Sequence, residues 1–216
     1  MSARMSLLQR LFGRSRSPSR TDLLNHLIAT RGYRDYLEIG VRDPRQNFDK
    51  VHVTGRKHSV DPDPQRPVTH EMTSDAFFAQ ADGTYDLVFI DGLHIADQVE
   101  RDILHSLERL TPNGAVVLHD VNPLTADAQT DDYDGKKHWN GTVWKAWVKL
   151  RATRADLSMR VLDMDEGCGF IERGTQQTID LPTTDYAKLD YALLARERTR
   201  LLNLVDPSVV LGPRAA

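Results

Sequence analysis

Two apolar runs joined by an amphipathic segment constrain the fold of this chain more than any other feature. The runs are DLVFID at 86–91 and GAVVLHD at 114–120, and each ends in an acidic residue. Apolar runs without alternation are typical of strands buried on both faces of a parallel sheet. Between them, apolar residues recur every four positions: Ile95, Val99, Ile103 and Leu107. This spacing predicts a helix ended by TPNG at 111–114, and hence a βαβ unit.

The remaining patterns extend this unit to a doubly wound α/β sheet. Further strands are predicted over 36–41 and 58–61, with a weaker one near 69–72. MRVLDMD at 159–165 and CGFIER at 168–173 predict an antiparallel closing strand pair. Helices are predicted in four places: from Thr21 or Asp22 to Gly32, around Phe77 and Phe78, over 142–151, and from about Asp185 onward.

Composition indicates one folded domain over 21–216. The chain has 216 residues, is 40% hydrophobic and 27% charged, and carries a net charge of -3, which offers no general attraction for nucleic acid. Cys168 is the one cysteine and is interpreted as structural, which excludes an intrachain disulfide and favours the reducing cytoplasm. No apolar run is long enough to cross a bilayer. Residues 1–20 hold five arginines and no acid, and are predicted to form a flexible tail, the alternative being a short basic amphipathic helix.

Polar residues collect where the predicted strands end. Ligands of open α/β sheets bind beyond the carboxyl ends of the strands. The residues there are Glu38, Gly40, Asp61, Asp91, His119 and Asp120. Any one of these acids has a local explanation, such as capping a turn. Because unpaired buried charges are costly, the whole set predicts a binding or catalytic site.

The order of the motifs LEIG, SVDPDP, MTSDAFF, DLVFIDGLH and GAVVLHD resembles class I S-adenosylmethionine (SAM) dependent methyltransferases. It is most similar to the small-molecule O-methyltransferase branch, whose fourth strand ends in an Asp-Gly-x-His type turn. The resemblance covers about 33–173 and implies a Rossmann-like methyltransferase sheet with SAM as cofactor.

The resemblance also implies roles for single residues. Glu38 and Gly40 match the motif that faces the methionine end of SAM, and Asp61 matches the acid that binds the ribose hydroxyls. Ser74 and Asp75 match the loop that reads the adenine edge, and Asp91 matches the acid beside the methyl donor or a metal. The loop GVRDPRQNF departs from the family, because Arg42 and Pro44 stand where glycines are frequent. The same loop lacks G-x-G-x-x-G, which counts against a nicotinamide dehydrogenase.

The turn after Asp91 suggests a base. Gly92 is expected to let the chain turn, which places His94 in the first turn of the next helix above the cleft. Related catechol-type enzymes have a lysine base there. An unperturbed histidine pKa of about 6.5 suits proton transfer near neutral pH, so His94 is predicted to be the general base, with a helix cap as the alternative.

A metal site is the more open question. Asp91, His119 and Asp120 are candidate ligands of a divalent metal. Mg²⁺ prefers oxygen ligands, and a histidine ligand would shift the preference toward Mn²⁺, Fe²⁺ or Zn²⁺. The sequence leaves open whether any metal is required.

The polar loop at 131–144 is expected to cover the acceptor. Its aromatic residues are suited to a sugar or a planar molecule, and they are Tyr133, His138, Trp139 and Trp144. Trp144, like Trp147 in the following helix, is also a candidate core residue. The predicted function is therefore O-methylation of a hydroxyl on a small or glycosylated acceptor. Two alternatives stay open, a metal-dependent hydrolase using Asp91, His94, His119 and Asp120, and a non-catalytic binding module. A homo-oligomer is also left open.

Overall fold

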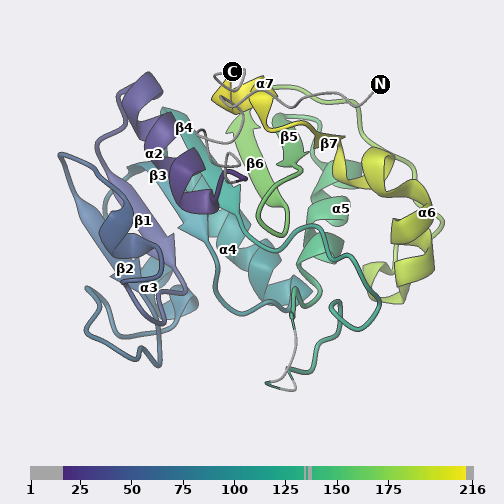
Figure 1. The fold of residues 1–216 in the computed structure, drawn as a ribbon, viewed down its shortest axis with the longest axis horizontal. Coiled ribbons are helices and arrows are strands. Elements are labelled where there is room, and N and C mark those ends of the chain that lie inside the picture. Colours follow the sequence, from purple (N-terminus) through teal and green to yellow (C-terminus); the bar gives the residue numbers. More distant parts are fainter. Residues whose placement is uncertain (1–16, 134, 136–137, 213–216) are drawn as a thin grey trace, which may run out of the picture.

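The structure, a computed structural model, describes residues 17–133, 135 and 138–212 (Figure 1). Its described strands form one mixed sheet in the order β2-β1-β3-β4-β6-β5-β7, which runs across Figure 1 from left to right. The strands are β1 (Tyr36–Ile39), β2 (Lys57–Val60), β3 (Tyr85–Ile90), β4 (Leu110–Leu118), β5 (Leu157–Leu162), β6 (Cys168–Arg173) and β7 (Leu204–Val205). The first four strands in sequence are parallel, and β6 is antiparallel to both β4 and β5. The predicted Rossmann-like sheet with an antiparallel closing pair is confirmed.

Helices cover both faces of this sheet. They are α2 (Arg20–Arg31), α3 (Ser74–Gln80), α4 (Ala96–Glu108), α5 (Val143–Thr153), α6 (Tyr191–Leu202) and α7 (Ser208–Leu211), with short 3-10 turns η1 (Phe48–Lys50) and η2 (Tyr186–Lys188). Along β3, Val88 and Ile90 pack into the core shared with α3 to α6, while Leu87 and Phe89 pack into the core shared with α2. This alternation shows why the strand has no polar residue from Leu87 to Ile90.

The predicted βαβ unit is confirmed. Helix α4 joins β3 to β4, and its stripe of Val99, Ile103 and Leu107 is buried against the sheet. Between β1 and β2 the described connection holds only η1 instead of a full crossover helix. The face that such a helix would cover is occupied by α2, whose leucines Leu23, Leu24 and Leu27 are buried.

Helix α2 begins earlier than predicted. Ser19 is its N-cap, and a capping box links the Ser19 and Asp22 side chains to each other's backbone N–H groups, so neither Thr21 nor Asp22 is the cap. Gly32, in the left-handed conformation at φ 69°, ends the helix as predicted. Arg20 therefore belongs to the folded part of the chain, and residues 1–16 of the predicted tail lie outside the described residues.

Two other predicted elements are wrong. The weak strand near 69–72 is only an isolated bridge between Val60 and His70, because prolines at 62, 64 and 67 interrupt the preceding segment. The C-terminal helix does not start at Asp185. After η2, Asp190 caps α6 with a 2.8 Å bond from the Leu193 N–H, and β7 and α7 follow it.

Two further observations concern the chain as a whole. Cys168 is buried in the core, and burial raises the pKa of its thiol to about 12, as suits a structural cysteine. None of the helices in the described part of the chain combines the length and the apolar character that crossing a membrane would take.

Candidate active site

A pocket of about 850 Å³ lies along the carboxyl ends of β1, β2, β3 and β4. The loop that contains Trp139 and the turn between β5 and β6 also line it. Of the predicted site residues, eight line it: Glu38, Gly40, Asp61, Ser74, Asp91, His94, His119 and Asp120. Asp75 does not. The strand ends therefore converge on one cavity, as the topology requires.

The floor of the pocket depends on close contact between the ends of β1 and β3. Gly40 has φ 86°, and a Cβ there would lie 2.3 Å from both the Asp91 carbonyl oxygen and the Gly92 Cα. Gly92 has no such requirement, because its φ is not positive and a Cβ would lie no closer than 3.5 Å, to the Ile39 side chain, which is ordinary van der Waals contact. The structure thus moves the glycine requirement of this turn from Gly92 to Gly40.

His94 lies just before α4, which begins at Ala96, and not in the first turn of the helix as predicted. Its Nδ1 is 3.2 Å from the Trp139 carbonyl oxygen. Because a carbonyl can only accept, Nδ1 carries a hydrogen, and Nε2 is directed to Asp91 Oδ1 at 3.3 Å and Asp120 Oδ2 at 3.5 Å. Burial opposes protonation, but the hydrogen bond to Asp91 and the charges of Asp120 and Asp91 outweigh it and raise the pKa of His94.

The loop beyond β4 holds His94 in place. The Trp139 ring stacks on the imidazole, with centroids 5.0 Å apart. The Thr142 N–H donates to the His94 carbonyl at 2.8 Å, and Gly141, at φ 57°, passes so close that a Cβ would lie 2.0 Å from that oxygen. Asn140 Nδ2 donates to Asp120 Oδ1 at 2.7 Å. The predicted covering loop is therefore built against the site.

The aromatic surface of this loop differs from the prediction at one residue. Tyr133 is exposed and its ring centroid lies 5.1 Å from that of Trp139. Trp144 is fully buried in the core of α5, as is Trp147, so Trp144 offers no surface to a ligand. Lysines 136 and 137, which the same loop contains, lie outside the described residues.

His119 occupies the centre of the acidic end of the pocket. Its Nδ1 lies 2.9 Å from Asp120 Oδ2 and 3.4 Å from Asp91 Oδ1, and its Nε2 lies 3.6 Å from Asp165 Oδ1. Burial opposes its protonation, but the charge of Asp91 and the carboxylate hydrogen bonds outweigh burial, and the pKa of His119 is raised. Arg20 Nη1 lies 3.2 Å from His119 Nε2 and opposes protonation of that nitrogen, because a guanidinium can only donate a hydrogen bond.

Asp165 reaches this cluster from the turn between β5 and β6. Asp165, Glu166 and Gly167 have φ values of 43°, 60° and 87°, so two non-glycine residues are held in the left-handed region. Asp165 Oδ2 accepts a 2.6 Å hydrogen bond from the Arg20 backbone N–H. Burial raises the pKa of Asp165, but the His119 and Arg20 contacts outweigh it and lower that pKa to about 2. Strained conformations of this kind concentrate at functional sites.

Glu38, from β1, also lines the pocket. Its Oε2 accepts hydrogen bonds from the Tyr36 hydroxyl at 2.5 Å and from Asn47 Nδ2 at 3.0 Å. Burial, assisted by the charge of Asp91, outweighs these bonds and raises the pKa of Glu38 to about 7. The carboxyl of Glu38 is therefore half ionised near neutral pH.

The far end of the pocket is built from β2, α3 and α4. Asp61 is 8% exposed, and its Oδ1 accepts a 2.9 Å bond from the Asp63 N–H. Ser74 Oγ accepts a 3.1 Å bond from Gln98, which also bonds the buried Asp102 at 3.0 Å. Asp75, in contrast, is exposed and its Oδ1 lies 3.4 Å from Arg101 Nε.

Sequence patterns did not identify several polar residues of the pocket, among them Arg20, Asp102, Asn140 and Asp165. Arg20 was assigned to the tail, and Asp102 lies within an amphipathic helix where an acid is usually solvated. The DEG at 165–167 was the one available signal, since consecutive polar residues before glycine are typical of a tight turn.

Three of the pocket residues suit a divalent metal. Ligand atoms of Asp91, His94 and Asp120 all lie within 4.8 Å of one another. The sequence placed His119 in this set, and in the structure His119 lies beside it, bonded to Asp120. Two carboxylates and one imidazole nitrogen fit Mn²⁺, Fe²⁺ or Zn²⁺ better than Mg²⁺.

Residues 41–121 match the family model of a methyltransferase domain, which covers the segment from the end of β1 to just after β4. A comparison with curated protein sequences gave no match.

The fold of this chain is similar to those of several solved structures. The O-methyltransferase TomG from Streptomyces achromogenes, in complex with SAM, is 17% identical with a TM-score of 0.52, over 76% of this chain and 85% of that one. An O-methyltransferase from Bacillus cereus, in complex with SAH, is 16% identical with a TM-score of 0.52, over 78% and 86%. A cofactor-bound protein from MTB is 15% identical with a TM-score of 0.54, over 76% and 84%. At these identities the likeness shows the fold: this chain has the Rossmann-like fold of SAM-dependent methyltransferases.

Proposed function

We propose that this chain is a SAM-dependent methyltransferase that methylates a hydroxyl group of a small or glycosylated acceptor. The observation that carries the proposal is the single pocket of about 850 Å³ that joins Asp61, at the end of β2, to His94 above Asp91. A cofactor site and a proton acceptor thus share one cavity. The methyltransferase family model and the fold of the solved O-methyltransferases support the same conclusion.

The residues present fit SAM. Asp61 is a buried acid whose second oxygen is available to accept from ribose hydroxyls, which is how related nucleotide folds bind ribose. Glu38 and Asp91 offer negative charge to the ammonium group at the methionine end. A volume of several hundred Å³ is typical of a pocket that encloses a ligand of this size.

His94 is proposed as the general base. Bound SAM would supply an electrophilic methyl group, and the chain must hold the acceptor oxygen and take its proton. The Trp139 carbonyl keeps the hydrogen of His94 on Nδ1, so the nitrogen that faces the pocket is the proton acceptor. Asp91 and Asp120, at 3.3 and 3.5 Å, then stabilise the imidazolium.

The acceptor is proposed to lie against the mouth of the pocket. Leu93 and Tyr133 line the pocket and are 53% and 56% exposed, and the Tyr133 ring contacts that of Trp139, which stacks on His94. Aromatic and apolar faces of this kind stack on sugars and planar rings. A small acceptor of one of these types fits the site better than a charged polymer would.

A second role for His94 has its own support. If a divalent metal binds Asp91, His94 and Asp120, then Nε2 is a ligand and the same nitrogen cannot act as the base. The metal would supply positive charge to lower the pKa of the acceptor hydroxyl. The two roles are therefore exclusive, and substitution of His94 distinguishes them.

Calorimetric titration with SAM and S-adenosylhomocysteine (SAH) tests the proposal. Asp61→Asn should weaken binding by about 1.5–3 kcal/mol, the scale of hydrogen bonds to a charged group. Asp75→Asn is the matched control, because Asp75 was predicted to contact adenine and the structure places it outside the pocket, so its affinity should equal that of the parent. Failure of the parent to bind either ligand contradicts the proposal and leaves the metal-dependent hydrolase and the non-catalytic binding module.

A further inference from the structure

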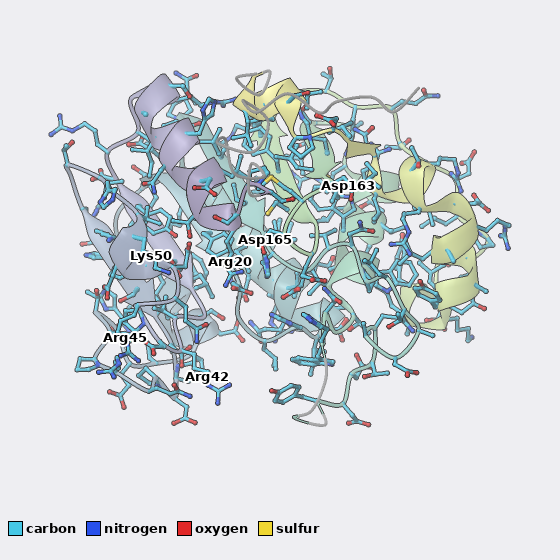
Figure 2. All side chains as sticks on the ribbon, in the orientation of Figure 1. Arg20, Arg42, Arg45, Lys50, Asp163 and Asp165 are labelled. Atoms are coloured by element: carbon cyan, nitrogen blue, oxygen red, sulfur yellow. The ribbon has the colours of Figure 1, made fainter. Side chains whose placement is uncertain are left out.

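Arg20 is the more buried of the two arginines that line the pocket in the described part of the chain. It lies at the first position of α2, and its side chain is 22% exposed. Figure 2 shows it beside Asp165 near the centre of the molecule, well away from Arg42 and Arg45 at the lower edge of the view. Arg42 also lines the pocket but is exposed. The pocket thus combines several acids with one largely buried guanidinium.

Part of the hydrogen-bonding capacity of this guanidinium is unused among the residues that the structure describes. Nε is buried and donates no hydrogen bond to any residue that the structure describes, and the nearest Asp91 oxygen is 3.7 Å away. Nη1 lies 3.2 Å from His119 Nε2 and 3.6 Å from Asp165 Oδ2. That Asp165 oxygen already accepts the Arg20 backbone N–H. Buried donors are almost always satisfied, so an unsatisfied one inside a pocket indicates a missing acceptor.

We propose that Arg20 binds the carboxylate at the methionine end of SAM. This inference rests on the proposed function. The methionine end carries an ammonium and a carboxylate, and the pocket presents acids and a cation side by side. Asp91 Oδ2 lies 3.7 Å from Arg20 Nε, and the charge of Arg20 acts to lower the pKa of Glu38. A planar guanidinium also matches a carboxylate with two parallel hydrogen bonds, and of the two arginines that line the pocket Arg20 is the one whose guanidinium is largely buried.

The test compares a ligand that has the carboxylate with one that lacks it. SAH and 5′-methylthioadenosine share the adenosine and the thioether, but methylthioadenosine has no amino-acid end. Both are titrated calorimetrically into the parent, Arg20→Gln and Arg20→Lys. Arg31→Gln is the matched control, because Arg31 lies at the other end of the same helix and pairs with Glu172 outside the pocket.

We expect Arg20→Gln to weaken SAH binding about 10- to 100-fold and to leave methylthioadenosine binding within about twofold of the parent. Arg20→Lys should lie between, because it keeps the charge and loses the planar pair of donors. Arg31→Gln should bind both ligands as the parent does. Retained methylthioadenosine binding also shows that the variant pocket is folded.

Three results would overturn the inference. Unchanged SAH affinity in Arg20→Gln would mean that the cofactor carboxylate is bound elsewhere, including the case in which Arg20 binds a carboxylate of the acceptor. Equal losses for both ligands would mean that Arg20 only supports the pocket. Should Arg20→Gln not fold, equal losses in Arg20→Lys would have the same meaning. A parent that binds neither ligand overturns the proposed function with it, whereas a parent that binds SAH separates the two failures.

Discussion

Replacing Gly40 by alanine should destabilise the whole rim of the pocket. Gly40 has φ 86°, where an L-residue is disfavoured, and an added Cβ would lie 2.3 Å from the Asp91 carbonyl oxygen and from the Gly92 Cα. Both atoms belong to the backbone, so neither can move aside as a flexible side chain would. The only relief is to separate the end of β1 from the end of β3.

The expected cost can be estimated from these two effects. The left-handed conformation costs an alanine about 1–2 kcal/mol, and overpacking against rigid neighbours costs about 1–3 kcal/mol. The sum is about 2–5 kcal/mol. For a domain with a typical stability of about 5–15 kcal/mol, this is a large share of the free energy of unfolding. Moving Asp91 away from Gly40 should also weaken SAM binding.

Gly92→Ala is the matched control, because its Cβ would lie no closer than 3.5 Å to any atom outside the adjacent residues and its φ is not positive. That variant should stay within about 1 kcal/mol of the parent, with stabilisation through a less flexible unfolded chain as one acceptable result. Urea unfolding of the three proteins gives the comparison. Equal stabilities for the Gly40 and Gly92 variants would refute the close contact between β1 and β3.

Three further predictions concern charge in the pocket. As the general base, His94 must be neutral, so kcat should fall as pH drops through its raised pKa. His94→Gln should lower kcat about 10²–10⁴-fold and abolish this acidic limb of the pH profile. Partial rescue of His94→Gln by excess metal would instead identify His94 as a metal ligand. If Asp91, His94 and Asp120 bind a metal, chelation should remove activity and Mn²⁺ should restore it, an expectation that full turnover by protein without metal in elemental analysis would exclude. Glu38, with a pKa of about 7, is protonated below that pH and loses its attraction for the SAM ammonium, so SAM affinity should be lower at pH 6 than at pH 8. Glu38→Gln should reduce this pH dependence of SAM affinity. An identical pH profile in parent and variant would argue against a contact between Glu38 and the ammonium.

The strand ends of the pocket could be predicted from sequence because they follow directly from chain continuity. A buried strand that stops on Asp91 or Asp120 must deliver that residue to the rim, whatever the rest of the chain does. Asp61 is reached by the same argument. Asp75 shows the limit, since a residue matched by motif order alone lies at the exposed start of α3 and its side chain contacts Arg101.

The contacts that sequence reasoning missed are long-range. The Arg20 N–H and Asp165 meet across 145 residues, and that contact depends on how α2 packs on the sheet and on a left-handed turn between β5 and β6. Neither determinant has a local periodicity. Trp144 was misplaced for a related reason: the boundary between a covering loop and a buried helix is set by packing of α5, which hydropathy does not resolve at a single residue.

The charges of the pocket also indicate which cofactors it can accept. Among the residues that the structure describes, the pocket is lined by nine acids and two arginines: Glu38, Asp43, Asp61, Asp63, Asp91, Asp102, Asp120, Asp165 and Glu166, with Arg20 and Arg42. A phosphate-bearing cofactor would meet repulsion along most of this surface, whereas SAM brings a sulfonium and an ammonium. Loss of the sulfonium charge on methyl transfer would remove part of that attraction, which favours exchange of the product for new cofactor. In this setting a single buried arginine has a defined task, because the carboxylate is the one group of the cofactor that the acids repel.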